Sequence, residues 1–168
     1  VTISEPAPLN ISSLVTDVTC WGACDGIIDA TVTGGTLPYL YNWVPVGIGS
    51  GALVTNLCDG AYILDIVDAN GCTEQAIINV NQPDSLTLVA SSIPSTCSTA
   101  NGSGNVTVTG GTPAYTYLWP NGQVTSIGTG LAEGTHNVQV TDNMGCVSFI
   151  DVIVTDQPSP IIDSIVWT

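Results

Sequence analysis

The stretch Val32-Thr33-Gly34-Gly35-Thr36 decides the fold because the chain contains it twice. It returns as Val108-Thr109-Gly110-Gly111-Thr112, and a Tyr-x-Tyr-x-Trp pattern follows each copy, ending at Trp43 and at Trp119. Chance does not produce a match of this length in this order. The chain is therefore built on an internal repeat.

The match extends through both halves of the chain. Further aligned pairs are Asp25-Gly26 with Asn101-Gly102, Leu57-x-x-Gly60 with Leu131-x-x-Gly134, Asp68-x-x-Gly71-Cys72 with Asp142-x-x-Gly145-Cys146, and Gln82-Pro83 with Gln157-Pro158. We therefore expect four segments, which are the end of a preceding repeat at 1–6, a first repeat at 7–83, a second at 84–158, and the first strand of a following repeat at 159–168. The parent protein is then much longer than 168 residues.

Hydrophobic periodicity within each repeat indicates β-strands. Ile28, Ala30 and Val32 alternate with polar residues, as does the series Tyr62, Leu64 and Ile66. Turn signals such as Gly34-Gly35 and Asn121-Gly122 separate the strands. The pattern predicts an all-β chain of two tandem immunoglobulin-like β-sandwich repeats, each stapled by a disulfide, with Trp43 and Trp119 in the two cores.

The charge balance excludes several classes of partner. The chain has no Lys and no Arg against fourteen Asp and Glu, so its formal charge is -14. Such a chain repels nucleic acid and anionic membrane surfaces. It also contains no run of about 18 apolar residues, so we expect no membrane insertion.

Six cysteines allow several disulfide patterns, and the repeat narrows the choice. Cys20 and Cys72 align with Cys97 and Cys146, whereas Cys24 and Cys58 align with Ala100 and Ala132. Residues that are present together and absent together suggest a bonded pair. We therefore predict the bridges Cys20–Cys72, Cys97–Cys146 and Cys24–Cys58, with a tight Cys20–Cys24 loop as the alternative, and an oxidising, extracellular location.

The order of these motifs resembles the SprB repeat, a family named for a giant gliding-motility adhesin of Gram-negative bacteria. The resemblance rests on Cys20, Asp25-Gly26, Thr33-Gly34-Gly35-Thr36, Pro38-Tyr39-x-Tyr41-x-Trp43, Leu57-x-x-Gly60-x-Tyr62 and Asp68-x-Asn70-Gly71-Cys72. It implies immunoglobulin-like units in long arrays, type IX secretion, display on the bacterial cell surface, and attachment to surfaces or polysaccharides, in some cases coupled to gliding.

Calcium is the cation that the unpaired carboxylates could attract. Carboxylate and amide oxygens at turns are the ligands it prefers, and the candidates are Asp68, Asn70, Asp142 and Asp25. The competing interpretation is that Asp68-x-Asn70-Gly71 is a turn whose side chains bond to their own backbone and need no metal. We expect no required cofactor, with calcium as an optional one.

Two further kinds of site can be named from the sequence. Ser85 and Ser164 lie in Asp-Ser-apolar triplets that resemble bacterial O-glycosylation sites. Trp21 and Trp167 fall outside the core pattern and are candidates for ligand contact.

Three functions remain open at this point. The first is a structural stalk segment of an adhesin whose partners are neighbouring repeats and an external target such as a surface polysaccharide. The alternatives are a subunit of a self-assembling fibre, formed by addition of a strand to the next molecule, and a carbohydrate-binding module. We expect no enzyme activity, because one His without Lys or Arg offers no nucleophile with its base.

Overall fold

The computed structural model describes residues 6–157, and every regular element within them is a β-strand. The chain divides into two compact units, Val1–Pro83 and Asp84–Thr168. The division falls between Pro83 and Asp84, where the repeat register changes from one copy to the next. Within residues 6–157 there is no helix that could cross a membrane. The segments expected at either end of the chain lie largely outside the described residues.

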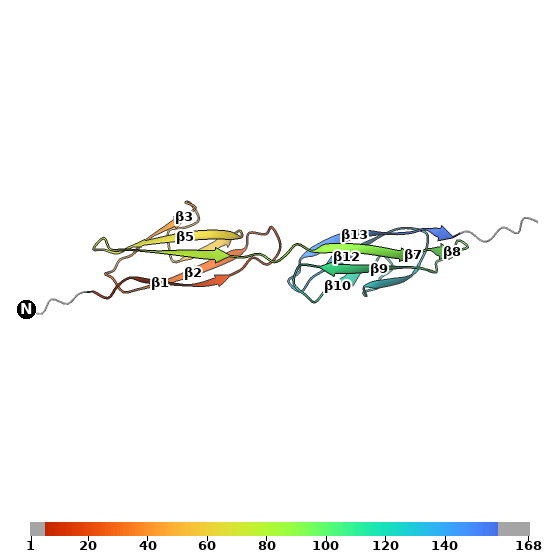
Figure 1. Cartoon of the computed structure of the whole chain (residues 1–168), viewed down its shortest axis with the longest axis horizontal. Coiled ribbons are helices and arrows are strands. Elements are labelled where there is room, and N and C mark those ends of the chain that lie inside the picture. The colour runs from red at the N-terminus through yellow and green to blue at the C-terminus, as the bar shows by residue number, and fades with distance from the viewer. Residues whose placement is uncertain (1–5, 158–168) are drawn as a thin grey trace, which may run out of the picture. The chain divides into compact units, whose positions relative to one another are not determined.

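The first unit is a sandwich of two three-stranded sheets. One sheet has the order β1-β2-β4 and the other has the order β3-β5-β6, with every pair antiparallel. Figure 1 shows β1 and β2 in one layer and β3 and β5 in the other. The bounds are β1 Asn10–Thr16, β2 Gly26–Thr33, β3 Leu40–Val44, β4 Leu53–Leu57, β5 Gly60–Val67 and β6 Thr73–Val80.

The second unit repeats this arrangement. Its sheets have the orders β7-β9-β11 and β10-β12-β13, again antiparallel, and a short parallel pair joins β8 to β14. The bounds are β7 Thr87–Ile93, β8 Ser95–Thr96, β9 Gly102–Thr109, β10 Thr116–Leu118, β11 Ile127–Leu131, β12 Gly134–Thr141, β13 Val147–Val154 and β14 Asp156–Gln157.

The strand order is that of an immunoglobulin-like sandwich. Named in chain order, the sheets correspond to strands A-B-E and C-F-G, which is the constant-type arrangement without strand D. Tyr62 at the start of the F-like strand donates its hydroxyl to the carbonyl of Cys58 at 2.9 Å, the contact known as a tyrosine corner. In the second unit His136 places its Nε2 2.9 Å from the carbonyl of Ala132. The predicted fold class is confirmed.

The core of each unit is its own. Ile28, Leu64 and Ile66 are fully buried in the first unit, and Val138 and Val140 are fully buried in the second. Trp43 and Trp119 lie in the two cores at 3% and 1% exposure, as their aromatic patterns predict. The residues between the buried ones on β2 and β5 are exposed or half-buried, so the predicted alternation is correct.

The two cores fill their space differently around the tryptophan. The third residue of β2 is Ile28 and the second residue of β4 is Val54, whereas β9 and β11 have Gly104 and Gly128 there. A Cβ on Gly128 would lie 2.6 Å from ring atoms of Trp119, and one on Gly104 would lie 2.9 Å from the same ring. The Trp119 indole therefore occupies the volume that two aliphatic side chains fill in the first unit.

We predict that Gly128→Ala destabilises the second unit by about 1–3 kcal/mol, because the added methyl group overlaps the buried indole. Gly128 has no positive φ, so the cost comes from packing and not from backbone strain. Gly51→Ala is the matched control, since a Cβ at Gly51 meets no atom within 4 Å. Urea unfolding of both variants measures the effect, and equal stabilities would contradict this account of the core.

The strand directions give each unit two poles. In the first unit the chain enters at residues 6–9, where the Gly35 N–H donates to the carbonyl of Ala7 at 2.8 Å, and we call this end the entry pole. The chain leaves beside residues 17–25, where the Val18 N–H donates to the carbonyl of Asn81 at 2.9 Å, and we call this end the exit pole. Since β5 runs antiparallel to β6, the turn at residues 68–72 lies at the entry pole.

Candidate functional site

A single carboxylate organises the entry pole of the first unit. Asp68 is only 5% exposed, and its Oδ2 accepts a hydrogen bond from the Thr36 N–H at 2.9 Å. Its Oδ1 accepts from the N–H groups of Asn70 at 2.9 Å and Cys72 at 2.8 Å. The Asp68 side chain therefore joins the turn between β5 and β6 to the turn that follows β2.

The second unit contains the same arrangement. The Oδ2 of Asp142 accepts from the Thr112 N–H at 2.8 Å, and its Oδ1 accepts from Met144 at 2.9 Å and Cys146 at 2.8 Å. The two residues between Asp and Gly in the turn differ, being Ala69-Asn70 in one unit and Asn143-Met144 in the other. Because the N–H donors to the two carboxylates belong to the backbone, these contacts do not depend on which side chain follows in the turn.

The repeated Gly-Gly pair makes this contact sterically possible. Gly34 and Gly35 have φ values of 78° and 59°, which L side chains rarely adopt. A Cβ on Gly34 would also overlap the carbonyl of Pro8. The Tyr39 hydroxyl donates to the carbonyl of Gly34 and so covers the turn. Gly110, Gly111 and Tyr115 repeat these features in the second unit.

The hydrogen bonds lower the pKa of both carboxyl groups. Desolvation by itself would raise the pKa of Asp68, but the N–H groups of Thr36, Cys72 and Asn70 together outweigh it, and the pKa lies below its ordinary value. The pKa of Asp142 is lowered for the same reason by its backbone donors. Both side chains are therefore ionised at neutral pH, and their charge is compensated by N–H dipoles.

The hydrogen bonds of Asp68, Asn70 and Asp142 compete with the predicted calcium binding by these residues. Each oxygen of Asp68 and Asp142 already accepts a backbone N–H, and the Asn70 side-chain amide donates to the Thr36 hydroxyl at 2.9 Å. This is the pattern that the turn interpretation predicts. Within residues 6–157 there is no group of three or more His, Cys, Asp or Glu that could hold a metal ion. Calcium binding stays a prediction.

At the exit pole, Asp25 closes the loop between β1 and β2. Its carboxylate accepts from the backbone N–H of Thr19 at 3.0 Å and from the Thr19 hydroxyl, and these bonds lower its pKa. The aligned Asn101 accepts from the Thr96 N–H at 2.8 Å and donates to the Thr96 hydroxyl at 2.8 Å. An uncharged amide thus performs the same role, so a negative charge at this position is not required for the loop.

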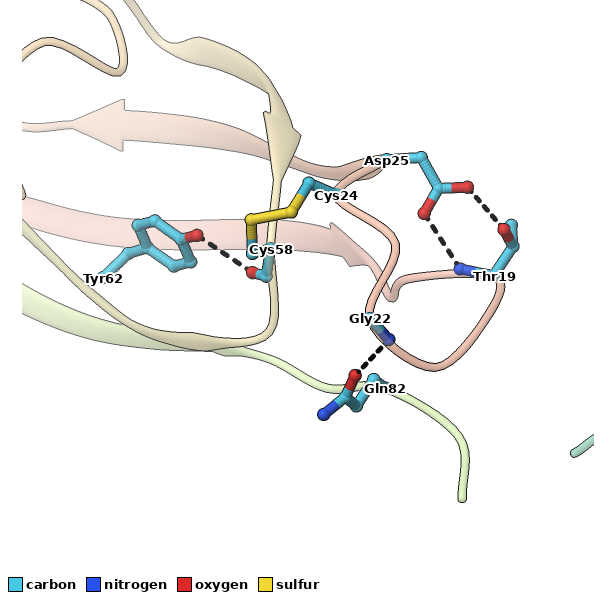
Figure 2. The surroundings of a disulfide bond; sticks show 7 residues. All are labelled: Thr19, Gly22, Cys24, Asp25, Cys58, Tyr62 and Gln82. Atoms are coloured by element: carbon cyan, nitrogen blue, oxygen red, sulfur yellow. Dashed lines mark hydrogen bonds between the residues drawn. A yellow bond between two sulfur atoms is a disulfide. The ribbon is translucent and has the colours of Figure 1, made fainter. Parts of the chain in front are cut away.

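The predicted bridge between Cys24 and Cys58 is present and lies at the exit pole. It ties the loop at residues 19–25 to the corner before β5, beside the Tyr62 contact (Figure 2). The same loop is held a second time, because the Gly22 N–H donates to the side-chain carbonyl of Gln82 at 2.8 Å. The alternative Cys20–Cys24 loop is therefore wrong.

The other two predicted bridges are wrong. Cys72 is a free, exposed thiol, so the predicted bridge Cys20–Cys72 does not form, and the predicted bridge Cys97–Cys146 does not form either. The reason is the strand direction, since Cys20 lies at the exit pole and Cys72 at the entry pole. An eight-residue strand separates the poles by roughly 25 Å, whereas the Cα atoms of a disulfide lie within about 7 Å. The expectation that each unit is stapled by its own disulfide therefore holds for the first unit only.

The remaining sequence candidates are placed as follows. Trp21 is 58% exposed on the exit-pole loop, and Ser85 is exposed just before β7. Ser164 and Trp167 lie outside the described residues. The structure therefore gathers Trp21, Cys24, Asp25 and Cys58 at one pole and Asp68 and Asn70 at the other.

Sequence reasoning missed the partners of these residues. Thr36 and Thr112 supply the N–H groups that Asp68 and Asp142 accept, and Gln82 fixes the Trp21 loop. The repeat did contain a signal for the first two, because Thr follows Gly-Gly in both copies. The repeat contained no signal for the contact between Gln82 and Gly22, because the corresponding loop of the second repeat is one residue shorter.

Residues 12–47 and 89–124 match the family model of the SprB repeat. Both units thus match the SprB repeat. Each matched segment begins in the first strand of its unit and includes the Gly-Gly turn and the core tryptophan. The match indicates a segment of cell-surface adhesin type, exposed outside the cell, and the disulfide of the first repeat agrees with an oxidising location. No curated protein matches the sequence.

Solved structures resemble the chain only at low identity. An eight-domain immunoglobulin fragment of Down syndrome cell adhesion molecule covers 90% of this chain at 11% identity and a TM-score of 0.47, and this chain spans 25% of that fragment. A C-terminal fragment of intimin, solved with the intimin-binding domain of its translocated receptor, gives 12% identity and a TM-score of 0.43, with 90% of this chain and 64% of that one covered. An amphioxus IgVJ-C2 molecule gives 13% identity and a TM-score of 0.33, with coverages of 90% and 98%.

We predict that replacing Cys24 and Cys58 by Ala together lowers the stability of the first repeat by about 4 kcal/mol. The estimate follows from the loop of 34 residues that the bridge closes in the unfolded chain. Alanine is the residue that the second repeat has at both aligned positions, so the change introduces no foreign side chain. Calorimetry should show one unfolding transition moving while that of the second repeat stays in place. Two unmoved transitions would contradict the prediction.

We also predict that Asp68→Asn destabilises the first repeat at neutral pH, because an amide has one acceptor oxygen where the carboxylate uses two. A lowered pKa in the folded state contributes stability above the ordinary pKa of Asp, and this contribution is lost as the pH falls through the folded pKa. The difference in Tm between wild type and variant should therefore shrink below about pH 4. The control is Asp29→Asn, an exposed carboxylate on β2, and a Tm loss of equal size there would refute the assignment.

Proposed function

We propose that this chain is a structural stalk segment of a large, secreted bacterial cell-surface adhesin. In this proposal the repeats separate an adhesive part of the parent protein from the cell and connect to neighbouring repeats on either side. Type IX secretion and a link to gliding motility belong to the same proposal and rest on the SprB match alone.

The observation that carries the proposal is that each repeat is complete in itself. Each has two sheets, a closed core and the same hydrogen-bonded entry pole. Units of this kind can be added in series without disturbing one another, which is what an array requires. Their stability needs no cation, because backbone N–H groups compensate the buried carboxylates.

The fibre alternative has less support. Addition of a strand from another molecule is favoured where a sheet lacks one of its own strands. Both described repeats contain the same six main strands, so neither sheet of one repeat lacks a strand that the other repeat has. The exposed apolar residues of the outer faces, such as Leu14 and Ile153, keep self-association open to test.

We further propose that the chain has no enzyme activity and requires no cofactor. The three carboxylates with lowered pKa values each hold a turn or loop in place. His136 contacts the carbonyl of Ala132 in a structural role that Tyr62 performs in the other repeat. The chemistry of this chain is then that of a durable scaffold with an external target.

The proposal predicts that antibodies raised against the purified chain label intact cells of the source bacterium. Binding should be equal before and after permeabilisation, because the repeats face the outside. Labelling that appears only after permeabilisation would overturn the surface location and the stalk function with it.

Sedimentation of the purified chain separates the stalk from the fibre. A stalk segment stays monomeric at 17.2 kDa as its concentration rises, whereas a fibre subunit grows into polymers. Concentration-dependent polymers would favour the fibre function even if the cells are labelled.

A further inference from the structure

Two aromatic side chains among residues 6–157 are strongly exposed, and their surroundings differ. Phe149 is 60% exposed in the middle of β13, on a regular outer face of the second repeat. Trp21 is 58% exposed on the exit-pole loop of the first repeat. Trp21 thus lies outside any strand, whereas Phe149 belongs to a regular strand face.

The loop that carries Trp21 is fixed at three points. Asp25 accepts two hydrogen bonds from Thr19, Gly22 donates to Gln82, and Cys24 is bonded to Cys58 (Figure 2). A side chain held on a rigid loop loses little conformational entropy when a ligand binds to it. The backbone that carries Trp21 is thus held in a preorganised position.

A polar hollow lies next to this loop. It is formed where β5 begins and β6 ends, and its lining residues are Asp59, Gly60, Ala61, Asn79, Val80, Asn81 and Gln82. Gln82 belongs both to the hollow and to the loop, because it accepts the hydrogen bond from the residue after Trp21. The hollow contains one carboxylate and three amide side chains, of which Asp59 and Asn79 are exposed, and Trp21 is one residue from the hydrogen bond that joins the loop to it.

This combination suits a sugar. The apolar face of a sugar ring packs on an indole, while its hydroxyl groups exchange hydrogen bonds with carboxylate and amide groups. The chain has no Lys or Arg, and its charge of -14 repels anionic sugars. We propose that Trp21 and the hollow formed by residues 59–61 and 79–82 bind a neutral or amino-sugar glycan.

The second repeat serves as an internal comparison. Ser98 follows Cys97 where Trp21 follows Cys20, the bridge is replaced by Ala100 and Ala132, and Ile153 stands where β6 has Asn79. The aromatic residue, the rigid loop and one of the amides are thus absent from that repeat together. The glycan site belongs to the first repeat alone and goes beyond a stalk function, so either proposal can fail without the other.

The test is binding of the intact chain to oligosaccharides, measured by calorimetry at millimolar sugar. The probes are a neutral glucan oligomer, a chitosan oligomer and an alginate oligomer as the anionic member. We expect binding to at least one of the first two and none to alginate. Trp21→Ala should weaken binding about tenfold, and Asn79→Ala should weaken it by a smaller factor.

Phe149→Ala is the matched control, because it removes the other exposed aromatic and leaves the exit pole of the first repeat unchanged. It should bind as wild type does. Unchanged Tm values for Trp21→Ala and Asn79→Ala verify that both variants fold. No binding to either favoured sugar, preferred binding to alginate, or equal losses in the Trp21 and Phe149 variants would each overturn the proposal.

Discussion

The hydrogen bonds from backbone N–H groups to Asp68 and Asp142 are the contacts on which each repeat depends. The chain has no Lys or Arg side chain that could pair with a carboxylate, so a nearly buried carboxylate needs other hydrogen-bond donors. Three N–H groups supply them in each unit, and they come from two separate turns. One side chain thereby joins the two sheets at the entry pole, and the signature of the repeat is the set of residues that allows this.

The Gly-Gly turn and the Asp turn are consequently one feature, although about thirty residues separate them in the chain. Gly34 and Gly35 admit the left-handed backbone and the close approach of the entering chain, and Tyr39 covers the turn. A substitution at either glycine would displace the Thr36 N–H from Asp68. The same reasoning explains why Thr, Gly, Gly and Thr recur in order while the two residues between Asp and Gly do not.

The sequence predicted most of the fold and part of the candidate site. Alternation identified the strands and the buried residues, because one face of each strand packs against the other sheet. Alternation could not predict which residues lie at which pole. The strands β3 and β4 run in the same direction, so the chain between them must return toward the entry pole. That return places Cys58 at the exit pole beside Cys24, and it leaves Cys72 at the entry pole. Cys24 and Cys58 are both missing from the second repeat, and this observation identified the correct pair. The cysteines that occur in both repeats were paired incorrectly.

The two repeats differ most where the sequence alone gives least guidance. In the second core, the Trp119 indole lies against Gly104 and Gly128 and fills the space that the Ile28 and Val54 side chains fill in the first core. Both interiors are therefore packed. The exit poles differ in another way, because Trp21 is exposed while the aligned Ser98 donates hydrogen bonds to Asp156. Packing therefore accounts for the differences between the cores and does not account for an exposed indole on a crosslinked loop. The proposed contact with a glycan outside the repeat would give that residue a physical role.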